Sequence, residues 1–84
     1  MKLMSEKFVK KNIKLSMEFD EYLVKHPELF KKIPNGAYIV ITIKNDPKFT
    51  EQSVSILKNT RRKKIVEAQK SGTSWTLRPF ATAH

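Results

Sequence analysis

The sequence predicts a single α+β domain spanning residues 1–84, in the order helix, short helix, strand, helix, strand, strand. Apolar residues recur with a helical period near the N-terminus, and a β-branched run occupies residues 37–43. A glycine-containing turn also separates two short β-prone segments near the C-terminus. A chain this short buries only about 60–65% of its unfolded surface, so we expect one core. Residues 1–4 and 81–84 are expected to be frayed.

The first predicted helix runs from Ser5 to about His26. Its core stripe is formed by apolar residues at spacings of three, four and seven, widened on one flank by Ile13, Met17 and Val24. The charged residues, mostly lysine, occupy the rest of the surface and should face solvent. Pro27 ends this helix, because proline lacks a backbone donor and restricts the preceding residue. A short second helix is then expected over residues 27–32.

Residues 37–43, with the sequence AYIVITI, predict a strand that is poor in charge and therefore expected to be central in its sheet. Asn45-Asp46-Pro47 is a helix-start pattern, because an acidic cap accepts free amide protons and proline suits the first helical position. That helix should reach about Arg61. A strand, a helix and a second strand in succession predict a right-handed parallel crossover.

The last two strands are predicted to form a hairpin with a two-residue loop at Ser71-Gly72, which places Ala68 opposite Trp75. Together the strands make a three-stranded mixed sheet whose isoleucine face is covered by the helices. The expected core consists of Phe8, Leu15, Phe19, Leu23, Phe30, Ile39, Ile41, Val54, Leu57, Val66, Trp75 and Leu77.

Composition narrows the class of protein. The chain has no cysteine, which excludes disulfides, thiolate metal sites and cysteine nucleophiles. It has no apolar run of signal-peptide or membrane-spanning length, so we expect a cytoplasmic protein without a membrane partner. The formal charge is +9, and residues 61–84 hold six bases against one acid. Such an excess of positive charge favours polyanionic or acidic partners.

Part of the chain is similar to a known family. The segment KLSMEFDEYLVKHPELFKKIPNGAYIVI, residues 14–41, followed by Asp46-Pro47, resembles a small prokaryotic family of uncharacterised proteins, a domain of unknown function. Its pattern reads LSxEFDxYLxxHPE, then IPxGAxIV, then DP. The resemblance implies a compact α/β domain of bacterial or archaeal type. It implies no activity, cofactor or catalytic residue.

No residue pattern indicates catalysis. His26 beside Glu28 could form an acid–base pair, but no nucleophile accompanies them, and a histidine at a helix end is commonly a capping group. Glu18, Asp20 and Glu21 are spread around a helix among lysines, as on a solvated face. Gly36 and Gly72 belong to no phosphate-binding loop. The sequence therefore predicts no enzyme, no catalytic or metal-binding residue and no cofactor.

The strongest local charge feature is the run from residue 61 to residue 64. With two bases on the hairpin it could form a patch for phosphates, beside Trp75 as a stacking or core residue. The candidate contacts are Arg61, Arg62, Lys63, Lys64, Lys70 and Arg78. We expect a non-enzymatic binding module for nucleic acid. The alternative is a protein-interaction or regulatory subunit, with an acidic protein partner or a homodimer formed through the sheet.

Overall fold

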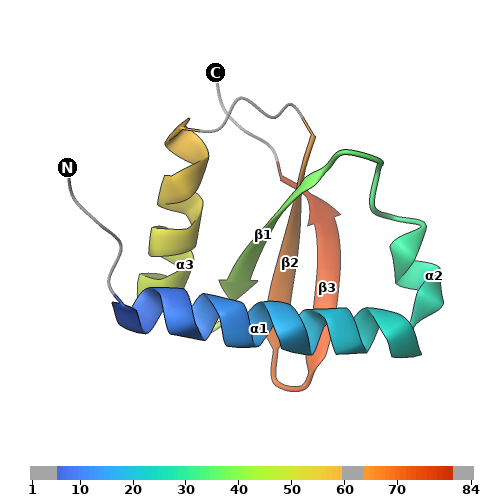
Figure 1. Ribbon diagram of the computed structural model, residues 1–84, viewed down its shortest axis with the longest axis horizontal. Helices are drawn as coiled ribbons and strands as arrows, with labels where there is room; N and C mark the ends of the chain where they lie inside the picture. The colour runs from blue at the N-terminus through green and yellow to red at the C-terminus, as the bar shows by residue number, and fades with distance from the viewer. Residues whose placement is uncertain (1–5, 60–63, 81–84) are drawn as a thin grey trace.

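The computed structural model describes residues 6–59 and 64–80 and has the predicted α+β fold (Figure 1). Every predicted element is present in the predicted order. Helix α3 is shorter than expected, because it ends at Ser55 and continues as a single 3₁₀ turn, η1. The elements are α1 (Glu6–Lys25), α2 (Pro27–Phe30), β1 (Tyr38–Ile43), α3 (Pro47–Ser55), η1 (Ile56–Asn59), β2 (Ile65–Ser71) and β3 (Ser74–Pro79).

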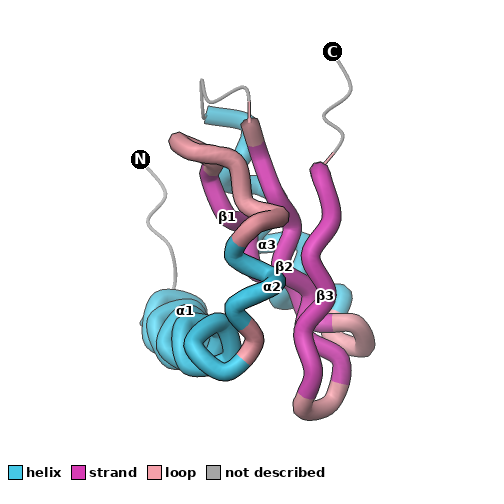
Figure 2. Tube along the Cα trace, turned by 90° about the vertical axis from the view of Figure 1, so that its right-hand side faces the viewer, coloured by secondary structure: helices cyan, strands magenta, loops and turns pink. Residues whose placement is uncertain are grey.

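The three strands form one mixed sheet in the order β1-β2-β3. Strands β1 and β2 are parallel, as the strand–helix–strand succession predicted, and β2 and β3 are antiparallel. Helix α1 lies across one face of the sheet, and α3 flanks β1 (Figures 1 and 2). The prediction that residues 37–43 form the central strand is wrong: β2 is central and β1 is an edge.

Strand β1 is apolar because its two faces are buried, although it is not the central strand. Both of its faces are buried, since Val40, Ile41 and Thr42 are each less than a tenth exposed. Helix α3 packs mainly against this strand. The Thr50 hydroxyl donates to the Ile43 carbonyl oxygen at 3.1 Å and accepts from the Ile43 amide at 3.0 Å. Thr50 of α3 thus occupies the open edge of β1 at Ile43, where a further strand could otherwise pair.

In the C-terminal hairpin the predicted side chains share each face, but the residues pair in a different register. Ala68 is opposite Leu77, and Lys70 is opposite Trp75, so the register differs by two residues from the expected one. The loop is therefore Gly72-Thr73. Gly72 has φ +63°, while no described residue other than glycine has a positive φ. This is the pattern of a type II′ turn, which suits the twist of a hairpin and favours glycine at its first central position.

The core lies between α1 and the sheet. Phe19 contacts Trp75 with ring centroids 5.1 Å apart, and Phe8 contacts Phe49 at the same distance. Trp75 is therefore a core residue. Phe30, expected in the core, is 59% exposed, because in the short α2 it is Leu29 that packs inward. Several core side chains were not in the predicted set: Val40, Phe49, Ile65 and Ala68.

Candidate anion-binding site

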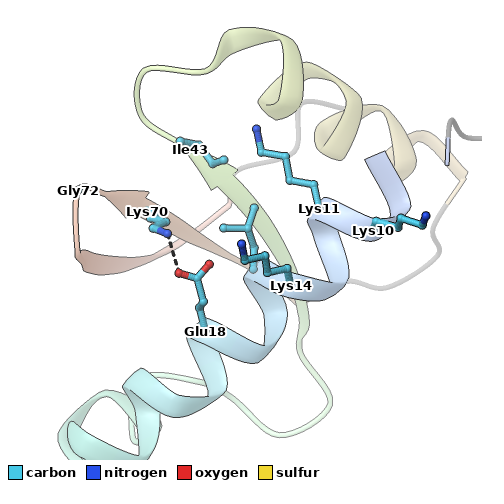
Figure 3. Close-up of a pocket in the computed structure, with 8 residues that line it drawn as sticks. Lys10, Lys11, Lys14, Glu18, Ile43, Lys70 and Gly72 are labelled. Carbon is cyan, nitrogen blue, oxygen red and sulfur yellow. Dashed lines mark hydrogen bonds and ion pairs between the residues drawn. The ribbon is translucent and has the colours of Figure 1, made fainter. Parts of the chain in front are cut away.

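A pocket of about 530 Å³ lies between α1 and the ends of two strands (Figure 3). We call it the lysine pocket. It is lined by Lys10, Lys11, Lys14, Leu15, Glu18, Ile43, Lys70 and Gly72. Four of these side chains carry an ammonium group and one carries a carboxylate, so the lining has an excess of positive charge. The lining residues come from α1, the end of β1, the end of β2 and the turn that follows it.

The local sequence explains this convergence. Lys10, Lys11, Lys14 and Glu18 recur at spacings of three and four, which puts them on one side of α1 next to its core stripe. Residues 43 and 70 are paired in the parallel register, so the two strands end together beside that side of the helix. The carboxyl ends of parallel strands are a common location for ligand sites in α/β folds.

Only part of the positive charge in the lysine pocket is neutralised within the protein. Lys70 Nζ donates to Glu18 Oε1 at 2.8 Å, and Figure 3 shows these side chains pointing toward one another. Lys11 Nζ donates to Asp46 Oδ2 at 2.9 Å. Within the described residues, Lys14 has no ion-pair partner. The pocket therefore holds at least one cation available to an anionic ligand.

The Asp46 carboxylate has a structural role beside this pocket. It caps α3 by accepting the Phe49 amide proton at 3.1 Å, as the sequence predicted. The hydrogen bond from Lys11, followed by that from the Phe49 amide, lowers the pKa of Asp46 below its ordinary value. Asp46 therefore fixes Lys11 and joins the first half of α1 to the start of α3.

Two smaller hollows continue the lysine pocket along α1. One, of about 380 Å³, shares Lys11 with it and adds Lys7 and Lys48. The other, of about 200 Å³, shares Lys70 and Glu18 and adds Lys25 and Glu21, so its bases and acids balance. From residue 7 to residue 25 the helix rises about 27 Å at 1.5 Å per residue. We call these three adjoining pockets together the basic groove.

Of the C-terminal residues proposed from the sequence, the three that the structure describes, Lys64, Lys70 and Arg78, do not lie together in one patch. Arg61, Arg62 and Lys63 lie outside the described residues. Lys64 is exposed just before β2 begins, whereas Lys70 is near the other end of that strand. Six residues of extended strand separate these two by about 20 Å. Lys70 is therefore grouped with the lysines of α1 rather than with Lys64.

Arg78 lies on the other face of the sheet and has a structural partner. Its Nε donates to Glu67 Oε1 at 2.9 Å, and the Thr42 hydroxyl donates to Glu67 Oε2 at 2.5 Å. Burial raises the pKa of Glu67, but the hydrogen bonds from Arg78 and Thr42 outweigh it and hold the pKa below its ordinary value. Arg78 thus compensates a buried carboxylate in the central strand.

His26 lies between α1 and α2. Its ring stacks on Tyr22 with centroids 4.1 Å apart, and its Nδ1 is 3.4 Å from Glu28 Oε1. Its backbone amide donates to the Tyr22 carbonyl oxygen, so it terminates α1. The side chain lines none of the three pockets described above. These contacts explain His26 as a helix-end residue.

Glu18, Asp20 and Glu21 of α1 do not form a cluster. Glu18 pairs with Lys70 across the fold rather than with a lysine of its own helix, while Asp20 and Glu21 are exposed. Across residues 6–59 and 64–80, no group of three or more histidine, aspartate or glutamate side chains is placed to hold a metal ion. In the same ranges, no helix is both long and apolar enough to cross a membrane.

Sequence reasoning missed the contribution of α1 to a basic site. Its lysines have the spacing of an ordinary solvated helix face, and nothing local distinguishes them. The available signal was long-range: the charged side of α1 adjoins the core stripe, and the parallel crossover brings the ends of two strands to one place. Combining those two predictions would have located the site.

One comparison with known proteins gives a result. A model described as a family of unknown function (DUF5647) matches residues 7–69. The chain belongs to this family. The DUF5647 match confirms the resemblance to an uncharacterised family, and it spans α1 through most of β2. All the α1 residues of the lysine pocket fall within the match, whereas Lys70 follows it by one residue. No curated protein and no solved structure matches the chain significantly.

Proposed function

We propose that this DUF5647 domain is a non-enzymatic binding module that holds a nucleic-acid strand in the basic groove along α1. The observation that carries the proposal is the convergence of Lys10, Lys11, Lys14 and Lys70 on one open pocket. The proposal keeps the ligand class expected from the sequence but moves its main contacts from the run at residues 61–64 to α1.

Charge supports a polyanion as the ligand. A strand that neutralises several lysines releases condensed counterions, which supplies most of the affinity in sequence-independent binding. The lysines of the basic groove are concentrated in the first half of α1, where phosphates of one strand can meet several ammonium groups. In the second half, Glu18 and Glu21 precede Lys25. Lysine acts as a point charge with three rotatable donors and imposes little geometry, which favours weak sequence selectivity.

The floor of the lysine pocket supports a ligand with apolar surface next to its charges. Leu15 is buried below the lysines and half-buried Ile43 lines the side formed by β1. Sugar and base surfaces can cover such a floor while phosphates face the ammonium groups. The apolar stems of the lysines add to this surface.

The test is a titration of fluorescein-labelled single- and double-stranded 12-mers by anisotropy at two salt concentrations. Replacing Lys10 and Lys14 by glutamine should weaken binding roughly tenfold at low salt and reduce the salt slope by about 1.5. The matched control replaces Lys31 and Lys32, which are exposed after α2, by glutamine and should change neither quantity. Equal losses in both variants would indicate that net charge alone attracts nucleic acid.

A third variant distinguishes the two candidate contact regions, which are the lysines of α1 and the run at residues 61–64. Replacing Arg61, Arg62, Lys63 and Lys64 by glutamine should reduce affinity less than the two changes in α1. The opposite order would return the main contact to the C-terminal run. If the wild-type protein binds neither oligonucleotide at low salt, the ligand is not nucleic acid, and an acidic protein becomes the candidate to test.

A further inference from the structure

Helix α1 carries a second apolar stripe that is exposed and lies outside the core cluster of the described structure. It consists of Val9, Ile13, Met17 and Val24, whose exposure rises from 42% at Val9 to 80% at Val24. Spacings of four and seven residues keep them on one side of the helix, away from the core stripe. A scattered exposed apolar residue needs no explanation, but four in line on one helix indicate an interaction surface.

We propose that this stripe pairs α1 with α1 of a second copy of the chain in an antiparallel arrangement. Charge complementarity along the helix selects this occupant. Lys10, Lys14 and Glu21 repeat the spacing of the stripe next to it, so they form one flank of the surface. The bases are in the first half of the helix and Glu21 is in the second half. Antiparallel pairing brings opposite charges together, whereas parallel pairing would place like charges side by side.

The register follows from these positions. In an antiparallel pair, the numbers of two facing residues have a constant sum. With a sum of about 31, Ile13 of one copy packs beside Met17 of the other at the centre of the interface. Lys10 of each copy then lies beside Glu21 of the other. Among the described residues of one chain, Lys10 pairs with Glu6, at 3.2 Å, and both side chains are more than three-quarters exposed. An exposed ion pair of this kind contributes little to the stability of the chain, so replacing it by an intermolecular pair costs little free energy.

The two-fold symmetry of the proposed dimer determines how the lysine flanks of the two copies lie relative to each other. The two-fold axis of an antiparallel helix pair is perpendicular to both helices, so equivalent flanks lie on the same side. The lysine flanks of the two copies would therefore form one continuous face. The pairing itself rests only on the stripe and its flanking charges, and it replaces the sheet as the expected site of self-association.

Sedimentation velocity over a wide concentration range, without nucleic acid, tests the pairing separately from the proposed function. The wild type should shift reversibly from the 9.8 kDa of one chain toward twice that mass. Replacing Ile13 and Met17 by glutamine, a good helix former, should abolish the shift. Phe30→Gln, which removes an equally exposed apolar residue from α2, should preserve it. A wild type that stays monomeric at millimolar concentration, or that associates equally in the Ile13 and Met17 variant, would overturn the proposal.

Charge exchange tests the antiparallel register. Lys10→Glu alone and Glu21→Lys alone should each weaken association several-fold, because each places like charges at the flank. The double variant restores opposite charges and should recover most of the wild-type association. A double variant no better than the two single variants would overturn the antiparallel arrangement. Both residues are exposed, so circular dichroism should show the same helix content in all variants.

Discussion

Glu67 and Arg78 are directly opposite one another in the hairpin, and the Arg78 Nε donates to the Glu67 carboxylate at 2.9 Å. Glu67 is in the central strand, where its residue is 7% exposed, so its charge needs partners that replace water. Thr42 on β1 supplies the second hydrogen bond, to Glu67 Oε2. These contacts join all three strands through one side chain.

Removing the Thr42 donor should destabilise the protein. Thr42→Val keeps the shape of the fully buried side chain but leaves one Glu67 oxygen without its hydrogen bond. We expect the free energy of unfolding to fall by about 1–3 kcal/mol. Urea denaturation followed by circular dichroism measures it, with Thr76→Val, an exposed threonine on β3, as the control. Equal stability of Thr42→Val and the control would show that the hydrogen bond does not contribute.

Glu67 should also make stability depend on pH. Its pKa is lower in the folded protein than in the unfolded chain, so its contribution is fully present above about pH 4.3 and is lost as the pH falls through the folded pKa. The wild type should therefore lose more stability between pH 7 and pH 3 than Glu67→Gln. Asp46, whose pKa is also lowered, titrates in both proteins and leaves their difference unaffected. Parallel stability curves for the two proteins would contradict this assignment.

Replacing Ser53, unlike replacing Thr42, is expected to stabilise the protein. Its hydroxyl is buried in α3 and has no hydrogen-bond partner within the described residues. Ser53→Ala removes this unsatisfied group and improves helix propensity, so it should raise the free energy of unfolding by about 0.5–1 kcal/mol. Ser55→Ala is the matched comparison, because Ser55 is exposed and its hydroxyl donates to the Gln52 carbonyl oxygen. A destabilised Ser53→Ala protein would show that the hydroxyl has a partner.

The hairpin turn gives a test of the observed register. Gly72→Ala should cost about 1–2 kcal/mol, because an L-residue with a side chain resists φ +63° although an added Cβ would contact nothing. Thr73→Ala, at the second position of the loop, should change stability by less than about 0.5 kcal/mol. Thermal unfolding of both variants measures the difference. Similar costs at residues 72 and 73 would contradict the type II′ turn.

The sequence predicted the order and type of the elements because each one has a local signal. Pro27 ends α1, Asp46-Pro47 begins α3, and Gly72 marks the hairpin turn. Local signals could not determine the two-residue shift of the hairpin, since both registers place Trp75 on the same face. Nor could they show that β1 is an edge, because a strand covered by a helix and a strand covered by neighbours have the same apolar pattern.

The candidate site was less predictable than the fold. Its basic residues were visible only as separate features: a lysine-rich side of α1 and one lysine near the hairpin turn. The consecutive bases at residues 61–64 dominated because proximity in sequence is easily recognised. Lys70 was among the predicted contacts, but its neighbours are on α1, more than fifty residues earlier. The fold brings them together by placing the end of β2 against that helix.

Mapping where a nucleic-acid strand contacts the protein tests the proposed binding site most directly. Chemical-shift perturbation of the ¹⁵N-labelled protein during titration with a single-stranded 12-mer gives this residue by residue. We expect the largest changes at Lys10–Glu18, Ile43 and Lys70–Gly72, around the lysine pocket. Perturbations confined to residues 60–64, or no perturbation in low salt, would contradict the claim that this pocket is the binding site.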